Sequence, residues 1–361
     1  MNKKRIMWLM ALCLTCLSGE KAEACTGITL KSQDGTFVLA RTIEWAGSYL
    51  NSRYVVVPRG YEQQSYVPDG GKDGLAFKAR YGYIGVSVEA EEFVTEGVNE
   101  EGLSAGLFYF PGYGGYESYN EAKKASSLAD LQLVPWLLSS FKTVDEVKAA
   151  LPSVHVVTVY PGASTAHWRI ADASGHQVVL EIVDGVPHFY ENKLGVLTNS
   201  PGFEWHLANL NNYVNLLPGS ADNKEWNGQT LAPFGGGSGM LGLPGDVTPP
   251  SRFVRAAFFQ MTAPRQATAE KAVRQAFQIL NNFDIPIGMQ FAEGQTPPDI
   301  PSATQWTAAT DPVNRKFYYR TMYDSRIRSF DLKTVDFARV KYQSENIDRV
   351  REQPIVPVVV K

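Results

Sequence analysis

Alternating hydrophobic and polar positions begin at Cys25 and predict a β-hairpin. The stretches Cys25–Leu30 and Phe37–Arg41 alternate and are rich in β-favouring residues, and Asp34-Gly35 between them is a turn signal. If Asp34-Gly35 is a two-residue turn, the numbers of paired residues sum to 69 and Cys25 faces Glu44; a longer loop shifts the pairing by a residue or two. In each case the second strand returns Arg41 and Glu44 to the neighbourhood of Cys25, unless the two charges simply end an exposed strand.

The rest of the pattern is a succession of strands, helices, strands, helices and strands. Strands are predicted at Tyr54–Val57, Tyr81–Val88, Phe93–Val98, Leu103–Phe110, His167–Ala171, Gln177–Val183, Val186–Tyr190, Gly195–Thr198, Lys316–Met322 and Arg326–Leu332. Helices are predicted at Leu128–Phe141 with a kink at Pro135, from Thr143 to just before Pro152, at Arg252–Met261 and at Ala269–Asn282. The segment Asn211–Gly245 is long, polar and rich in glycine and proline. The helical blocks are amphipathic and need a sheet to cover, so we predict an α+β fold in which two stacked sheets lie between helical layers. No repeat or linker interrupts the pattern, and we expect a single domain over residues 25–361.

The first 24 residues have the organisation of a cleaved signal peptide. Lys3, Lys4 and Arg5 precede an apolar run over residues 6–18, and Ala22-Glu23-Ala24 supplies the small-x-small pattern that signal peptidase recognises. Cleavage after Ala24 would make Cys25 the first residue of the mature chain. We therefore expect export to the periplasm or the medium of a bacterium.

A cysteine at the N-terminus would be a nucleophile that carries its own base. An α-amine has a pKa of roughly 7.7–8.0, so near neutral pH part of it is free to accept a proton from the thiol or from an attacking water. Cys13 and Cys16 leave with the leader, so the mature chain would have one cysteine and no intramolecular disulfide. Two other readings stay open, a lipid-modified cysteine of a lipoprotein and an inert buried cysteine.

Composition and charge exclude several function classes. The chain is 44% hydrophobic and 12% aromatic with a net charge of −3, which suits a large core and gives no sign of nucleic-acid binding. Past the leader no apolar run approaches the roughly 20 residues of a membrane-spanning helix. The five histidines show no metal-type spacing, and we expect neither a metal nor a cofactor. A papain-like pairing of Cys25 with His206 remains an alternative mechanism.

One segment is unusually aromatic and glycine-rich. Tyr109–Tyr116 contains four tyrosines or phenylalanines and three glycines within one stretch that regular structure would not favour. We interpret it as a loop lining an apolar pocket, or as a loop that is merely well packed.

Several motifs resemble the choloylglycine hydrolase family, which contains bile salt hydrolases and penicillin V acylases. The motifs are Cys25-Thr26-Gly27, Ala40–Trp45, Glu96–Leu103, Gly195–Pro201, Glu204-Trp205-His206, Ala208-Asn209-Leu210, Gly242–Asp246 and Ser251-Arg252-Phe253. The resemblance implies a four-layer αββα N-terminal-nucleophile fold, often a homotetramer, that hydrolyses linear carbon–nitrogen amide bonds.

The resemblance also implies roles for individual residues. Cys25 matches the nucleophile, Arg41 the arginine beside it, Asn199 an oxyanion-hole asparagine and Arg252 a second active-site arginine, while Glu44 replaces an aspartate near the α-amine. Trp45, Phe108 and Tyr109 are expected to bind substrate, and Phe108-Tyr109 stand where bile salt hydrolases have an asparagine and are closer to the tyrosine of penicillin acylases. The expected substrate is a small amide, with conjugated bile salts favoured over penicillin V and acyl-homoserine lactones. The non-enzymatic alternative is an exported binding protein.

Overall fold

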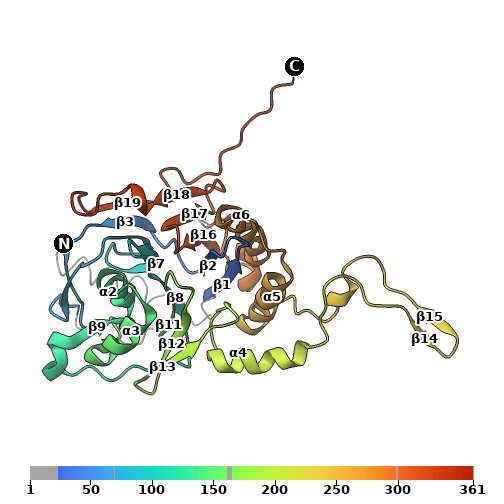
Figure 1. The fold of residues 1–361 in the computed structure, drawn as a ribbon, viewed down its shortest axis with the longest axis horizontal. Coiled ribbons are helices and arrows are strands. Elements are labelled where there is room, and N and C mark those ends of the chain that lie inside the picture. The colour runs from blue at the N-terminus through green and yellow to red at the C-terminus, as the bar shows by residue number, and fades with distance from the viewer. Residues whose placement is uncertain (1–22, 69, 161–164, 298–299, 361) are drawn as a thin grey trace.

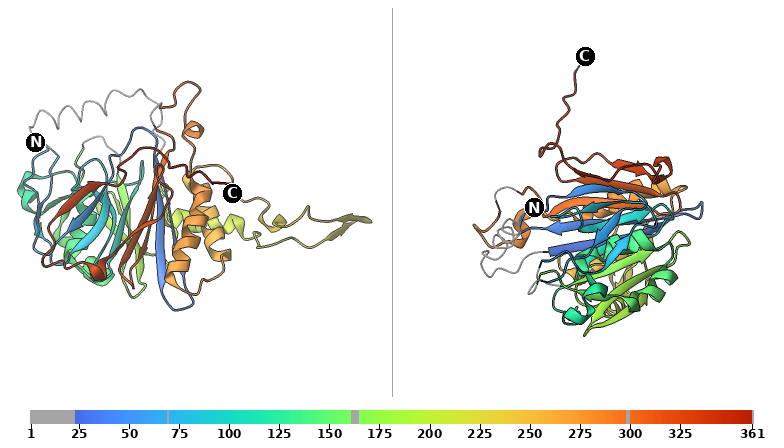
Figure 2. Two further views of the ribbon diagram at one scale, coloured as in Figure 1. Left: turned by 90° about the horizontal axis from the view of Figure 1, so that it is seen from above. Right: turned by 90° about the vertical axis from the view of Figure 1, so that its left-hand side faces the viewer.

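Two antiparallel β-sheets stack between two layers of helices in the computed structural model, which describes residues 23–68, 70–160, 165–297 and 300–360 (Figures 1 and 2). The first sheet has the strand order β1-β2-β16-β17-β18, and the second has the order β13-β12-β11-β8-β7-β6-β3-β19. Seen from above in Figure 2, the helices α5 and α6 lie outside the first sheet, and α2 and α3 lie outside the second. The predicted α+β class and αββα layering are confirmed.

The strands of the first sheet are β1 (Glu23–Lys31), β2 (Phe37–Trp45), β16 (Thr304–Asp311), β17 (Lys316–Thr321) and β18 (Arg328–Asp331). Those of the second are β3 (Arg53–Val57), β6 (Tyr83–Ser87), β7 (Val94–Asn99), β8 (Ser104–Tyr109), β11 (Ala166–Ala171), β12 (Gln177–Val183), β13 (Val186–Glu191) and β19 (Gln343–Asn346). Short pairs form between β4 (Glu62–Gln64) and β5 (Ala76–Lys78), between β9 (Ser127–Ala129) and β10 (His155–Val157), and between β14 (Lys224–Trp226) and β15 (Gln229–Leu231). The α-helices are α2 (Leu133–Ser140), α3 (Val144–Ala150), α4 (Phe203–Asn209), α5 (Pro249–Thr262) and α6 (Ala269–Leu280).

The helical layers follow from the spacing of apolar residues. In α6 the buried residues Ala269, Ala272, Val273, Ala276 and Leu280 fall on one helix face and pack on the first sheet. The helix α3 begins at a capping box, where the Thr143 side chain accepts the Glu146 N–H. Its buried residues Val144 and Val147 pack with residues of the second sheet. Each helical block therefore covers a sheet, as the pattern predicted.

The register of the β1–β2 hairpin differs by one residue from the register that a two-residue turn at Asp34-Gly35 would give. Cys25 pairs with Ile43, Ala24 with Glu44, and Gly27 with Arg41, so paired numbers sum to 68. The connecting loop runs over residues 32–36, because Asp34 accepts a bond from the Thr36 N–H and Gly35 takes a left-handed φ of +84°. The expectation that Cys25 faces Glu44 was wrong.

A shift of one residue exchanges the two faces of a strand. In the observed register the side chain of Arg41 shares the face of Cys25, toward the second sheet. The side chain of Glu44 shares the opposite face with Ala24, toward α5 and α6. The two charges predicted to meet at the nucleophile thus approach it from different sides of the sheet.

Three other elements differ from the sequence prediction. The strand β16 lies at the centre of the first sheet and was not predicted, because it is buried along both faces and shows no alternation. The helix predicted from Leu128 begins only at Leu133, and Pro135 lies in its first turn, where a missing N–H causes no kink. The stretch Gly195–Thr198 makes only an isolated bridge from Leu197 to Gly27.

The long polar segment forms an arm that leaves the body of the molecule. It contains the hairpin of β14 and β15, and Figure 1 shows it extending beyond α5. Apolar side chains along it are exposed, including Val214 at 88% and Leu241 at 83%. The long, polar and glycine- and proline-rich segment therefore contains a β-hairpin.

The proposed leader, residues 1–24, lies outside the described residues except for its last two. Glu23 and Ala24 extend β1 and pair with Trp45 and Glu44. Among the residues that the structure describes, no helix is long and apolar enough to cross a membrane.

Candidate active site

Cys25 lies near the start of β1, an edge strand of the first sheet, with its side chain buried between the sheets. The Arg41 guanidinium reaches it from the neighbouring strand, and Nη2 donates to Sγ at 2.7 Å. Arg41 is fixed by donation from Nε to the Thr42 carbonyl (3.1 Å) and from Nη1 to the Leu107 carbonyl (2.6 Å). Its guanidinium also lies 4.2 Å from the centre of the Phe108 ring. The geometry places a fixed positive charge directly on the thiol.

Asn199 contacts the backbone nitrogen of the same cysteine. Its Oδ1 accepts the Cys25 N–H at 2.8 Å and a bond from Arg252 Nη2 at 2.7 Å. Its Nδ2 donates to the Tyr109 carbonyl at 2.7 Å. These partners fix the orientation of the amide, since a flipped side chain would set an NH₂ group against a guanidinium and an oxygen against a carbonyl. One amide hydrogen of Asn199 is thus committed to Tyr109.

The segment that carries Asn199 lies along the open edge of β1. Gly27 and Leu197 exchange two backbone hydrogen bonds, at 2.7 and 3.1 Å. Two buried histidines then hold the next carbonyls, with His167 Nε2 donating to Thr198 O (3.0 Å) and His206 Nε2 to Asn199 O (2.8 Å). Residues 174 positions apart in the chain are brought together in this way.

Arg252 approaches from α5 on the opposite face of the sheet. Its Nη1 donates to the Cys25 carbonyl and, at 2.8 Å, to Thr26 Oγ1, while Nε donates to the Val247 carbonyl at 2.8 Å. The nitrogen, the carbonyl and the sulfur of Cys25 are therefore each held by a different side chain.

Glu44 is buried on the same side as Arg252. Burial raises the pKa of its carboxyl group to about 7, against the opposing effect of the Arg252 charge. Its Oε1 accepts a bond from Thr304 Oγ1 at 3.4 Å, and its Oε2 has no hydrogen-bond partner among the described residues. Glu44 does not bond the Cys25 nitrogen directly; it faces the preceding residue, Ala24.

The ionisation of the thiol depends on two opposing influences. Burial raises the pKa of Cys25 above its usual value, and the Arg41 charge acts in the opposite direction. In the continuous chain the Cys25 nitrogen is a peptide nitrogen bonded to buried Ala24. As an amide nitrogen it has no basic lone pair.

The three residues expected to bind substrate differ in their exposure. Phe108 is fully buried with Arg41 and Arg169 against its ring, so we correct its expected role from substrate contact to support of the arginines. Trp45 is partly exposed and donates from Nε1 to Ser48 Oγ at 2.9 Å. Tyr109 is partly exposed, and its carbonyl bonds Asn199.

His206 does not have the geometry of a papain-like base. Its ring stacks on Phe253 at 4.6 Å and donates to Asn199 O, and no hydrogen bond joins it to Cys25 within the described ranges. Burial lowers the pKa of His206 to about 4, so the ring is neutral near pH 7. It positions Asn199.

Sequence reasoning gave no role to Glu96, His167, Arg169 and Glu181, all of which are buried near this site. The signal for them was charged or polar side chains inside strands that are otherwise apolar, such as Arg169 between Trp168 and Ile170. A charge in such a place is rarely buried without a partner.

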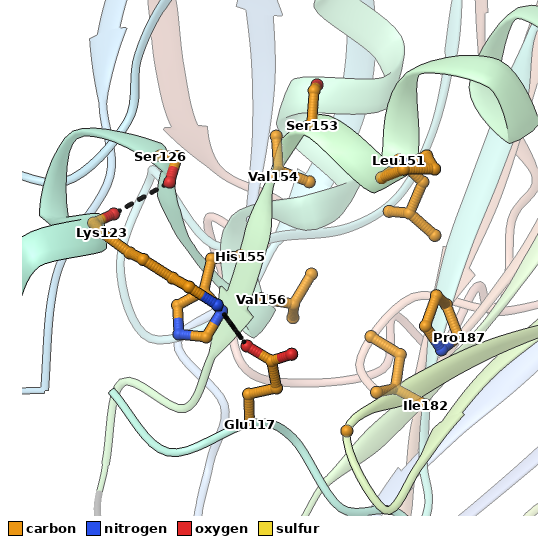
Figure 3. A pocket seen from close by; sticks show the side chains of 12 residues that line it. Glu117, Lys123, Ser126, Leu151, Ser153, Val154, His155, Val156, Ile182 and Pro187 are labelled. Carbon is orange, nitrogen blue, oxygen red and sulfur yellow. Dashed lines mark hydrogen bonds and ion pairs between the residues drawn. The ribbon is translucent and has the colours of Figure 1, made fainter. Parts of the chain in front are cut away.

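A cavity of about 410 Å³ lies elsewhere, against β10 and β12 (Figure 3). Its polar groups satisfy one another, since Glu117 lies 2.8 Å from His155 Nδ1 and 3.0 Å from Lys123 Nζ. None of the residues around Cys25 lines it. Across the described residues, no group of three or more His, Cys, Asp and Glu side chains could hold a metal ion.

Comparison with known proteins identifies relatives over most of the chain. A family model described as linear amide C–N hydrolases, choloylglycine hydrolase family, matches residues 25–347. A bile salt hydrolase/transferase of Clostridium perfringens is 31% identical over 85% of this chain and 92% of its own. A penicillin V acylase of Pectobacterium atrosepticum is 25% identical over 83% of this chain and 78% of its own.

Solved structures give the same grouping. The crystal structure of a variant of conjugated bile acid hydrolase from Clostridium perfringens has a TM-score of 0.79 and 27% identity, covering 93% of this chain and 100% of that chain. Penicillin V acylase from Agrobacterium tumefaciens has a TM-score of 0.71 at 23% identity, covering 90% of this chain and 92% of that chain, which shows a shared fold.

Proposed function

The chain belongs to the choloylglycine hydrolase family of linear amide C–N hydrolases, and from this we propose that it hydrolyses bile acids conjugated to glycine or taurine. The observation that carries the proposal is the set of contacts on Cys25. Arg41 touches its sulfur, Asn199 its nitrogen and Arg252 its carbonyl. The bile salt hydrolases at about 31% identity support the choice of substrate.

The proposed reaction starts once the bond between Ala24 and Cys25 is cut. The new α-amine takes the proton of the thiol, and the sulfur attacks the amide carbonyl. The amine then gives that proton to the leaving nitrogen, so that glycine or taurine departs and a thioester remains. A water molecule, deprotonated by the same amine, attacks the thioester and releases the bile acid and the thiol.

The surrounding residues have distinct proposed tasks. Arg41 favours the thiolate, and Asn199 Oδ1 holds the amine through one hydrogen so that its lone pair is oriented. The second amide hydrogen of Asn199, with a backbone N–H, is the proposed donor to the oxyanion; one such donor is typically worth about 2.7–4 kcal/mol. Glu44 and Arg252 fix the charge and position of the new N-terminus.

Penicillin V is the second candidate substrate, and Tyr109 is the observation that favours it. The residue stands at the position where the family resemblance points to penicillin acylases, and its carbonyl is bonded to Asn199. A side-by-side measurement of kcat/KM on glycocholate, taurocholate, penicillin V and an acyl-homoserine lactone determines the order of substrate preference. A tenfold advantage for penicillin V, about 1.4 kcal/mol of transition-state preference, would reverse it.

The same measurements separate the enzyme from a binding protein. Cys25→Ser retains the size of the side chain and should fold normally but lose most turnover of every substrate in the panel. Thr29→Ser, on the same strand but outside these contacts, is the matched control. Full hydrolysis by Cys25→Ser would refute the mechanism.

Export and assembly also remain proposals. We propose that residues 1–24 direct export to the periplasm or medium and that the mature chain forms a homo-oligomer, a tetramer by analogy with its family. The exposed apolar side chains of the arm support contact with a second copy.

A further inference from the structure

A buried charge cluster adjoins Arg41 in the space between the two sheets. Glu96, on β7, places Oε2 at 3.6 Å from Arg41 Nη1 and Oε1 at 3.2 Å from Nη2 of Arg169, on β11. All three side chains are at most 2% exposed. One carboxylate therefore lies between two guanidinium groups, and one of these guanidinium groups bonds the sulfur of Cys25.

Glycines and an aromatic ring make room for this cluster. Gly106 pairs with Glu96, and a Cβ on Gly106 would lie 2.1 Å from Glu96 Oε2. A Cβ on Gly27 would lie 2.9 Å from the Phe108 ring and 3.0 Å from Arg169 Nη1. The backbone near both groups is thus free of side chains where the charged groups need the space.

The cluster carries one uncompensated positive charge. Two guanidinium groups, always protonated, share one carboxylate. Apart from Arg41 Nη2, which donates to Cys25 Sγ, the hydrogen bonds of the two guanidinium groups go to neutral carbonyls, those of Ile28 and Ala40 for Arg169 and those of Thr42 and Leu107 for Arg41.

Besides Arg41, the charged groups that act directly on the thiol are Arg252 on α5 and Glu44 on β2, and a backbone hydrogen bond from Tyr109 also lowers the pKa of the thiol. These two are opposite in sign and lie on the far face of the sheet. On the face of the sheet that carries the Cys25 side chain, the charged groups are therefore Arg41, Arg169 and Glu96, whose net charge is +1. Of these three, Arg41 contacts the sulfur. A thiolate would neutralise this net charge.

We propose that Arg169 and Glu96 are positioning residues that act through Arg41 to set the ionisation of Cys25. Arg169 supplies the excess positive charge that favours a thiolate, and Glu96 limits that excess while anchoring both arginines. The inference rests on the proposed role of Cys25 as nucleophile and names two residues that control its reactivity.

The experiment measures the pH dependence of iodoacetamide alkylation of the mature enzyme, in which Cys25 is the single cysteine. Arg169→Met removes a positive charge, so the midpoint of alkylation should move about one pH unit higher. Glu96→Gln removes a negative charge, so the midpoint should move about one pH unit lower. The double variant keeps the net charge of the original cluster and should return close to the wild-type midpoint.

Two controls distinguish this role from packing. Arg169→Lys keeps the charge and should retain the wild-type midpoint. Arg328→Met removes an arginine paired with Asp348 on another part of the first sheet and should leave the midpoint unchanged. Turnover of Arg169→Met at neutral pH should fall mainly in kcat and recover at higher pH.

The signs of the shifts decide the outcome. Opposite shifts in the single variants with return in the double variant support the inference. If Glu96→Gln does not fold, an upward shift in Arg169→Met that the double variant reverses supports it equally. Unchanged midpoints, or shifts in the same direction, would overturn it while leaving the hydrolase proposal intact, whereas full hydrolysis by Cys25→Ser would overturn the hydrolase proposal whatever the alkylation profile.

Discussion

At the scale of single residues, each atom of Cys25 that the proposed reaction uses is held by a different charged or polar group. Arg41 and Glu44 lie three positions apart on β2 and therefore reach Cys25 from opposite faces of the sheet. This separation keeps the two side chains from forming an ion pair with each other. Arg41 bonds the sulfur, and Glu44 lies on the side of the nitrogen.

Glu44→Gln tests the electrostatic link to the new N-terminus. Glu44 faces Ala24, so cutting that residue away would leave the α-amine beside the carboxylate. An opposite charge favours the protonated ammonium, so removing it should lower the pKa of the amine and move the acidic limb of the pH–rate profile to lower pH. The check is kcat/KM measured from pH 4 to 9, with Glu44→Asp as the charge-retaining control. An unchanged profile in Glu44→Gln would mean that the two groups are not coupled.

The same substitution has a consequence for stability in a chain that retains Ala24. Burial raises the pKa of Glu44 from 4.5 to about 7. The folded state therefore binds a proton more tightly than the unfolded state, and its stability is lost as pH rises from 4.5 to 7, by on the order of 3 kcal/mol. Glu44→Gln should remove that loss and be more stable relative to wild type at pH 8 than at pH 5. Denaturant unfolding at the two pH values measures this; an equal difference at both would contradict it.

At the scale of elements, the site depends on one irregular segment that caps an edge strand. The stretch from Gly195 to Asn199 has no sheet of its own, yet its bonds to β1, His167 and His206 place the Asn199 amide within 2.8 Å of Cys25. A loop held by rigid neighbours on two sides can present a side chain as accurately as a strand does.

His206→Phe removes the hydrogen bond to the Asn199 carbonyl while keeping an aromatic ring that can stack on Phe253. The Asn199 carbonyl would lose its donor, and the amide should shift relative to Cys25. We expect kcat to fall about 10- to 100-fold with a smaller change in KM. Trp205→Phe, on the same helix but half exposed, is the control and should be near wild type. Equal kcat in the two variants would show that the loop holds its shape without His206.

At the scale of the whole molecule, the fold includes two residues, Glu23 and Ala24, that the proposed mechanism requires to be cut away. Glu23 and Ala24 already pair with β2, and Ala24 is buried. These two residues are thus compatible with the folded structure. Under the proposed mechanism the chemistry requires a cut before Cys25, whereas the fold accommodates Glu23 and Ala24 uncut.

A chain that begins two residues ahead of Cys25 tests this separation. It should show the thermal unfolding of a folded protein but no hydrolysis, because its Cys25 nitrogen is an amide without basic character. Placing a protease site before Cys25 and cutting it should restore turnover. Hydrolysis by the uncut form would show that the α-amine is not the base.

The arm supplies the prediction about assembly. Trp226 and Phe234 are exposed on it at 66% and 105%, which is unusual for large apolar side chains on a monomer. Replacing both by lysine should reduce the mass measured by light scattering without changing the fold. Val358→Lys, in the equally exposed C-terminal segment, is the control. A wild-type mass equal to one chain would refute the assembly proposal.

Much of this protein could be predicted from local sequence. The hairpin, the amphipathic helices and the layered α+β fold each depend on residues close together in the chain, where periodicity and turn chemistry act directly. The family motifs likewise pointed to Cys25, Arg41, Asn199 and Arg252, which the structure brings together.

Tertiary structure decided two things: the exact register of paired strands, and the contacts between residues far apart in the sequence. Asp34-Gly35 identified the turn but not the length of its loop, and a single residue of register determined that Arg41, and not Glu44, shares the face of Cys25. The strand β16 showed no alternation because both of its faces are buried. Glu96 and Arg169 carry no local signal of their partners, since a buried charge is stabilised only by groups that other strands bring to it.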